Sequence, residues 1–74
     1  MDFICYSALN HIIYGVGATA ADAITDARWN ARDPDVDTST WRTAPATASL
    51  IDLIHRAGGD CCWQLDRATG TATL

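Results

Sequence analysis

Residues 12–27, IIYGVGATAADAITDA, contain the strand-to-helix passage on which the predicted fold depends. The first five of these residues are mostly β-branched or aromatic, and they predict a strand over residues 12–16. Thr19 is a favourable helix N-cap, and Asp22 follows three residues later, as in a capping box with Asp in place of Glu. The small and apolar residues that recur at helical spacing after this cap are Ala20, Ala23, Ile24, Ala27 and Ala31. The stretch therefore predicts a strand followed directly by an amphipathic helix.

Gly15 and Gly17 form part of a G-x-G-x-x-A pattern between this strand and helix. In a Rossmann domain, such small residues let a pyrophosphate approach the N-terminus of the helix. The chain is too short for the parallel sheet of that fold, and the preceding strand belongs to a predicted hairpin. We therefore favour a simpler interpretation, in which the two glycines permit a tight turn from strand to helix.

The neighbouring segments extend the predicted fold on both sides of this stretch. Residues 2–8 predict an earlier strand, and the turn that follows them is too short for a parallel crossover, so we expect an antiparallel hairpin. The helix should end near Asp33, because a residue that precedes proline is pushed out of the helical region. Residues 34–43 are polar and predict an irregular connection.

The C-terminal half predicts a second helix and a second hairpin. Pro45 suits the first turn of a helix that runs to about Ala57, where Gly58 and Gly59 stop it. Residues 60–67 alternate as a third strand, and residues 71–74 can pair back as a short fourth strand. The predicted order is ββααββ, a single α+β domain over residues 1–74 with an antiparallel sheet packed by two helices.

The composition indicates a small acidic protein that binds a basic partner. The 74 residues carry nine acidic and five basic side chains, for a net charge of −4, and every acid is Asp and every base is Arg. Direct binding of nucleic acid needs clustered Lys and Arg, which argues against that function. A basic protein surface suits the charge better, with electrostatic steering of the encounter. A thin core and open sheet edges leave both a monomer and a homodimer possible.

The cysteines and histidines do not predict an enzyme or a metal protein. Cys5, Cys61 and Cys62 are odd in number and two are adjacent, so they do not form a disulfide framework. A zinc site lacks the usual C-x₂-C pair, and we expect buried thiols that act as small apolar residues. We predict no catalytic residues, no metal and no cofactor. Neither a signal peptide nor a membrane span is visible, which predicts a cytoplasmic protein.

One face of the first predicted helix is the first candidate for a binding surface. At 100° per residue, Asp22, Asp26, Trp29 and Asp33 cluster opposite the alanine and isoleucine stripe. Carboxylates around a tryptophan are typical of an interface with an aromatic anchor. The alternative is a solvated helix face whose tryptophan folds over the following loop, since single exposed apolar residues are ordinary.

The acidic run DPDVD, residues 33–37, is the second candidate. Asp33, Asp35 and Asp37 fill the first three ligand positions of an EF-hand loop, but Thr38 replaces the required glycine and Ala44 the required glutamate, which argues against calcium. Two interpretations remain. The run is either a solvated connector or an extended row of carboxylates that imitates a charged polymer backbone. The nearby Trp41 is either a further contact residue or a cap on the edge of the core.

The size, the acidity, the D-x-D-x-D run and the acidic helix face resemble those of small anti-CRISPR proteins of phages and other mobile elements. The chain is most similar in character to those that inhibit type I effector complexes (Cascade). The resemblance implies an inhibitor, not an enzyme, that binds a Cascade subunit and blocks target DNA by mimicking it. The partner-binding residues would then be Asp22, Asp26, Trp29, Asp33, Asp35, Asp37 and Trp41. The alternative function is an antitoxin-like or other regulatory interaction module.

Overall fold

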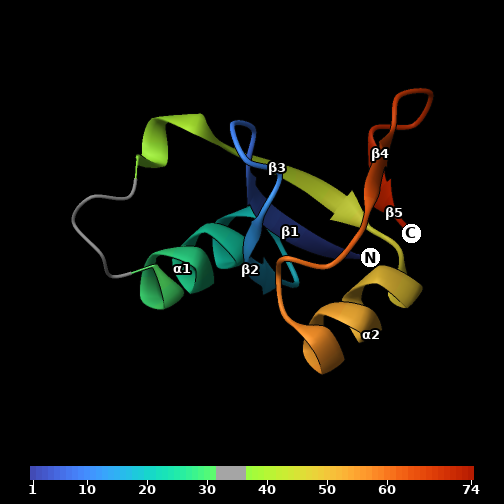
Figure 1. The fold of residues 1–74 in the computed structure, drawn as a ribbon, viewed down its shortest axis with the longest axis horizontal. Coiled ribbons are helices and arrows are strands. Elements are labelled where there is room, and N and C mark those ends of the chain that lie inside the picture. Colours follow the sequence, from blue (N-terminus) through green and yellow to red (C-terminus); the bar gives the residue numbers. More distant parts are fainter. Residues whose placement is uncertain (32–36) are drawn as a thin grey trace.

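The structure is a computed structural model that describes residues 1–31 and 37–74. The chain alternates strands with helices, as Figure 1 shows along its colour gradient. The elements are β1 (Asp2–Ser7), β2 (Ile13–Gly17), α1 (Ala20–Asn30), the 3₁₀ turn η1 (Thr38–Thr40), β3 (Trp41–Ala46), α2 (Ala48–Ala57), β4 (Gln64–Asp66) and β5 (Thr71–Thr73). The predicted α+β class is confirmed, whereas the predicted order ββααββ is wrong, because a further strand lies between the two helices.

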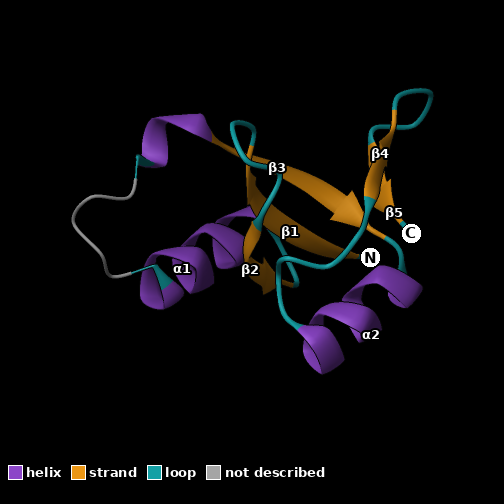
Figure 2. Ribbon diagram, in the orientation of Figure 1, coloured by secondary structure: helices purple, strands orange, loops and turns teal. Residues whose placement is uncertain are grey.

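The five strands form one mixed sheet in the order β2-β1-β3-β5-β4 (Figure 2). β1 is antiparallel to β2 and to β3, and β4 is antiparallel to β5, which confirms both predicted hairpins. β3 and β5 run parallel. The predicted antiparallel sheet is therefore wrong. In the observed sheet, β3 and β5 are parallel because the chain crosses from one to the other through α2 and β4.

β3 is the element that the sequence pattern concealed. Trp41–Ala46 was expected to be partly irregular and partly helical, yet it pairs with β1 along all six residues. Pro45 lies inside this strand instead of starting the helix. β5 pairs with β3 only at Ala46, so β3 has an open edge along most of its length, where a strand tolerates proline. The helix begins one turn later, capped by the Thr47 hydroxyl, which accepts from the Leu50 N–H at 3.3 Å.

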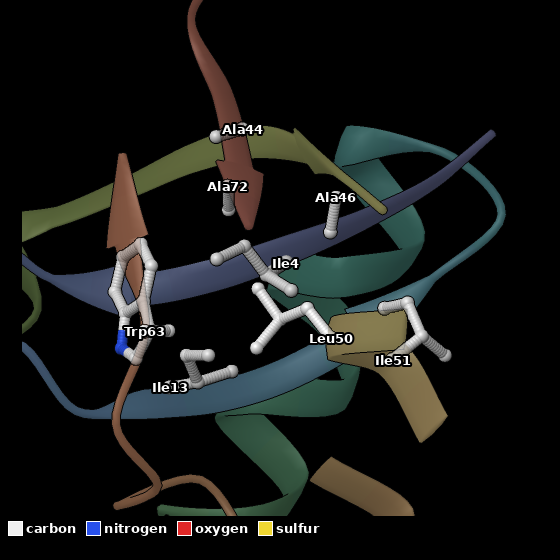
Figure 3. Close-up of a cluster of buried hydrophobic side chains, with 8 residues drawn as sticks. All are labelled: Ile4, Ile13, Ala44, Ala46, Leu50, Ile51, Trp63 and Ala72. Atoms are coloured by element: carbon white, nitrogen blue, oxygen red, sulfur yellow. The ribbon is translucent and has the colours of Figure 1, made fainter. Parts of the chain in front are cut away.

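The two helices cover opposite faces of the sheet. Adjacent residues of a strand point to opposite faces, and Ile4 and Cys5 of β1 are both fully buried. Cys5 packs with Ala23 and Ala27 of α1. Ile4 packs on the other side, in the cluster that Figure 3 shows, to which α2 contributes Leu50 and Ile51. That cluster contains Ile4, Ile13, Ala44, Ala46, Leu50, Ile51, Trp63 and Ala72.

The glycines of β2 let α1 lie directly on the sheet. A Cβ added at Gly15 would clash with the carbonyl oxygen of Ala23 and with the backbone of Ala27, whose Cα would lie 2.8 Å away. A Cβ at Gly17 would lie 2.6 Å from the Cβ of Asp22. Neither glycine has a positive φ angle, so the predicted tight turn is not the reason for them. They are required because the helix backbone occupies the space of a side chain. The predicted cap at Thr19 is confirmed, with its hydroxyl 3.1 Å from the Asp22 N–H.

The loop between β1 and β2 is held to the segment before β4 by a His–Trp pair. The rings of His11 and Trp63 stack with centroids 3.8 Å apart and planes 9° apart. The Trp63 indole donates to the His11 carbonyl oxygen at 3.0 Å, and the His11 Nε2 lies 2.9 Å from the Trp63 carbonyl oxygen. Trp63 was expected within a strand over residues 60–67, but β4 starts only at Gln64. Trp63 instead closes the α2-side core, where it is 7% exposed.

Candidate functional site: the acidic surface around α1

The outward face of α1 carries an exposed acid and an exposed aromatic ring. Asp22 lies in the first turn and is exposed. Trp29 lies in the last turn and is 68% exposed, which is unusual for a side chain of its size. Both project away from the face that buries Ala23 and Ala27. The helical period therefore placed these two residues correctly, and they form the exposed part of the predicted helix face.

Asp26 has a different position and a different set of contacts. It is only half-exposed, and its Oδ2 accepts from the Val16 N–H of β2 at 3.0 Å and from the Asn30 amide at 3.3 Å. Asn30 also donates to the Tyr14 carbonyl oxygen at 2.9 Å. β2 is an edge strand, and such edges present unpaired backbone groups. Asp26 and Asn30 satisfy two of these groups, so Asp26 helps to hold α1 on the sheet.

Asp37 lies where the described chain resumes, and it caps η1. Its Oδ1 accepts from the Ser39 hydroxyl at 2.6 Å and from the Ser39 N–H at 3.0 Å. These two hydrogen bonds, the side-chain one first, lower the pKa of the exposed Asp37 carboxyl. The carboxylate therefore stays ionised at every ordinary pH. Asp33 and Asp35, the other members of the predicted acidic row, lie outside the described residues.

Trp41 follows η1 as the first residue of β3, and it is half-buried. Its ring stacks on Tyr14 with centroids 5.6 Å apart, and it packs against the cluster that contains Cys5. Of the two predicted roles, a cap on the core edge accounts for these contacts. Trp41 and Tyr14 both border a cavity of ≈ 300 Å³ that is also lined by Asp37 and by Leu9, a residue 78% exposed. The fold thus brings Asp37 and Trp41 to one cavity, next to η1.

The carboxylates of this surface are not neutralised by arginines within the described chain. In residues 1–31 and 37–74, the ion pair that forms joins Asp52 to Arg56 of α2, at 3.0 Å and largely exposed to solvent. Asp22 and Asp37 have no cationic partner among the same residues. Their charges therefore act outward, which favours an encounter with a basic surface.

The three thiols differ in exposure. Burial raises the pKa of the Cys5 thiol, and the nearby Arg28 guanidinium opposes this rise only in part. Burial also raises the pKa of Cys61, whereas Cys62 is exposed, so the expectation of buried thiols fails for Cys62. Within the described parts of the chain, no three metal-ligating side chains come together. No helix there has the length and apolar character to cross a membrane.

The sequence did not indicate that Arg28 and Arg42 share a cavity with Cys5 and Trp41. Arg28 lies on the first predicted helix, whereas Arg42 belongs to the segment predicted to be irregular. Only the pairing of β3 with β1 brings them to one place. Comparison of the chain with protein-family models, with curated proteins and with solved structures gave no match.

Proposed function

We propose that this chain is a small protein-binding inhibitor that uses the acidic surface around α1 to occupy a basic, nucleic-acid-binding surface of its partner. The observation that carries the proposal is the 68% exposure of Trp29 on a helix face that also presents the Asp22 carboxylate. Tryptophan is the residue type most enriched among residues that dominate binding energy at interfaces. A protein this small has few large apolar side chains to build its core, so a large ring that is left on its surface suggests a contact residue.

The charge of the surface defines the class of partner. Asp22 and Asp37 are exposed, without a cation among the described residues, and the whole chain has a net charge of −4. Short aspartate side chains keep their charges close to the backbone, much as phosphates lie along a nucleic-acid strand. A groove in which Arg and Lys normally hold phosphates would attract such a surface. Asp33 and Asp35, between α1 and Asp37 in sequence, belong to the same proposal.

The type I Cascade complex of CRISPR systems is the specific partner that we propose. The support is the resemblance in size, charge and acidic patterning to small anti-CRISPR proteins. Under this proposal the chain acts in the cytoplasm of a bacterial host. It competes with target DNA for a DNA-binding subunit and catalyses no reaction.

The test measures the affinity of the purified chain for a purified type I Cascade complex, with and without target DNA, at low and high salt. The wild type is expected to bind, DNA is expected to compete, and added salt should weaken the complex because the contact is electrostatic. Trp29→Ala should weaken binding by about thirtyfold, since truncation of a hot-spot tryptophan costs about 2 kcal/mol or more.

Two double variants that carry the same net charge distinguish the effect of the proposed surface on binding from the effect of the net charge. Asp22→Asn/Asp37→Asn removes two charges from the proposed surface, and the matched control Asp60→Asn/Asp66→Asn removes two elsewhere. Asparagine at 37 and at 66 retains an oxygen for the hydrogen bonds from Ser39 and Ala68. The first pair should weaken binding and the second should not. Equal affinities for the two pairs would reject this surface, and binding that DNA cannot displace would reject the mimicry.

A further inference from the structure

Among the described residues that line the cavity of ≈ 300 Å³ next to η1, Asp37 is the one that carries a charge. The lining comes from the end of β1 and the turn after it, from β2, and from the chain that enters β3. Its members are Ser7, Leu9, Asn10, Tyr14, Asp37, Thr40 and Trp41. Ligand cavities usually have volumes of about 300–1,000 Å³, so this one has room for a single side chain or a small molecule. We call it the Asp37 cavity.

The uncharged polar side chains of this cavity are already hydrogen-bonded within the chain. The hydroxyl groups of Ser7 and Thr40 lie 3.2 Å apart. The Asn10 amide donates to the Tyr14 hydroxyl at 3.4 Å, and its side-chain oxygen accepts from a backbone N–H at 3.2 Å. These groups are satisfied without a ligand. The Asp37 carboxylate is therefore the group of the lining that is best placed to recognise one.

The Asp37 carboxylate is fixed through one of its oxygens. Its Oδ1 accepts from the hydroxyl of Ser39 at 2.6 Å and from the N–H of the same residue at 3.0 Å. A carboxylate has about four lone-pair sites, two on each oxygen. No described residue donates to Oδ2, so its two sites remain for a donor from outside. Because the hydrogen bonds from Ser39 lower the pKa of this carboxyl, the group is ionised at ordinary pH.

Arg42 is near Asp37 in sequence but does not neutralise it. The Nη1 of Arg42 donates to the carbonyl oxygens of Ser39 and Trp41, at 3.2 and 2.8 Å. In the described parts of the chain, no arginine forms an ion pair with Asp37. One ionised carboxylate beside neutral walls gives the cavity a negative charge, which a cation would complement.

Apolar surface borders the same cavity. Leu9 is 78% exposed, and the rings of Tyr14 and Trp41 lie with their centroids 5.6 Å apart. Arginine and lysine bury their methylene stems along such surface while the charged head group reaches a polar partner. Arginine suits it better, because a guanidinium is more weakly hydrated than an ammonium and packs well against aromatic side chains.

We propose that the Asp37 cavity receives an arginine side chain of the partner protein. The guanidinium would donate to the Asp37 carboxylate, and the methylene stem would lie against Leu9 and the two aromatic rings. The assignment of this arginine to a partner rests on the proposed function, since a surface that binds nucleic acid presents arginine and lysine to phosphates. The cavity would make the acidic surface selective for one of these two cations.

The experiment titrates the isotope-labelled whole chain with N-acetyl-arginine amide at constant ionic strength and follows the backbone N–H resonances by NMR. Both ends of this probe are blocked, so it represents an arginine within a protein. Saturable shifts are expected for Leu9, Asn10 and Thr40, at about millimolar concentrations because one exposed charge pair contributes little. N-acetyl-citrulline amide has a similar shape without the charge and should bind about fivefold more weakly. N-acetyl-lysine amide should lie between the two.

Variants assign the binding to the cavity. Asp37→Asn removes the charge but keeps an oxygen for the hydrogen bonds from Ser39, and asparagine is an equally good cap, so the fold should persist. This change should weaken the binding of N-acetyl-arginine amide by about fivefold. Asp60→Asn removes one charge from the loop between α2 and β4 and is the matched control. Leu9→Ala shortens an exposed apolar side chain and should weaken the binding by a smaller factor.

Equal binding of N-acetyl-arginine amide to Asp37→Asn and Asp60→Asn would overturn the proposal, as would shifts confined to residues outside the cavity. If N-acetyl-lysine amide binds as tightly as the arginine probe, the site recognises charge alone and the assignment to arginine is wrong. Tighter binding of free arginine than of the blocked probe would make the cavity a site for the free amino acid instead of a protein side chain.

Binding to Cascade is measured separately, so the two proposals fail in different ways. Cascade binding by a chain that has no affinity for N-acetyl-arginine amide rejects the arginine site alone. Affinity for this probe without any binding to Cascade rejects that partner alone.

Discussion

Replacement of Gly15 by alanine tests the close approach of α1 to β2. In an unobstructed strand, alanine in place of glycine would stabilise the protein by about 0.5–1 kcal/mol, because glycine loses more backbone entropy on folding. Here the new methyl group would meet the carbonyl oxygen of Ala23 and the backbone nitrogen and Cα of Ala27. The structure therefore predicts the opposite sign, a loss of stability.

The size of this loss follows from the kind of atoms that clash. All three neighbours are backbone atoms of α1, so no rotation of a side chain relieves the contact, and the helix must move as a body. Overpacking of this kind costs about 1–3 kcal/mol, and we expect the upper end. At roughly 0.05–0.15 kcal/mol per residue, a chain of 74 residues has a stability of about 4–11 kcal/mol. Gly15→Ala should thus remove a quarter or more of it.

Urea unfolding under reducing conditions, followed by tryptophan fluorescence, measures this loss. The unfolding free energy of a domain this small falls by about 1 kcal/mol per M of urea. The urea concentration at the unfolding midpoint should therefore fall by roughly 2–3 M, while this slope stays unchanged. Gly70→Ala is the control for the residue change itself. Gly70 has a φ of 71° and open space around it, so alanine there should cost only about 1–2 kcal/mol of backbone strain. A Gly15→Ala protein as stable as the wild type would refute the close packing of α1 on β2.

Three further predictions follow from single contacts. Asp26→Ala should destabilise the fold by about 1–2 kcal/mol in urea unfolding, because the Val16 N–H of β2 loses its acceptor. Asp22→Ala should change the stability little. Equal effects of the two substitutions would contradict the role of Asp26 in holding α1 on the edge strand β2. Trp63→Phe keeps an aromatic ring but removes the indole N–H that donates to the His11 carbonyl oxygen and leaves part of the core unfilled. A loss of at least about 1 kcal/mol is expected, and an unchanged midpoint would argue against that bond. Burial raises the pKa of Cys5 in the folded state, so the folded protein holds this proton more tightly, and stability should decline as the pH rises above the ordinary thiol value of about 8.5. Cys5→Ala should decline less steeply over the same pH range, and a wild-type slope in that variant would assign the decline to other groups.

The sequence predicted those elements whose signals are local. These elements depend on neighbours a few positions apart in the chain. They are the two strands of the first hairpin, the helix N-cap at Thr19 and the C-terminal hairpin. The structure has each of them, with strand ends shifted by one residue in the first hairpin. The third predicted strand shrank to three residues, because Trp63 turns into the core instead of continuing the ladder.

β3 was missed because its local signals conflict with its role. Its residues are short, polar or proline, and Pro45 is typical of a helix start. Pairing with β1 over six residues outweighs these preferences, since strand propensity reflects the surface on which a residue packs. The parallel alignment of β3 with β5 joins residues that are distant in sequence, and no local pattern reports it.

The candidate site likewise has features that the sequence predicted and features that only the packing of the elements creates. The 3.6-residue period alone predicted Asp22 and Trp29 on the outside of α1, where both are exposed, whereas the basic partner that the acidic composition suggests stays a prediction. The contact of Asp26 with β2, the stacking of Trp41 on Tyr14 and the cavity bordered by Arg28 and Arg42 depend on which strand lies beside which. Periodicity and charge are properties of the chain read in order, whereas a cavity or a shared hydrogen bond exists only once distant segments pack together.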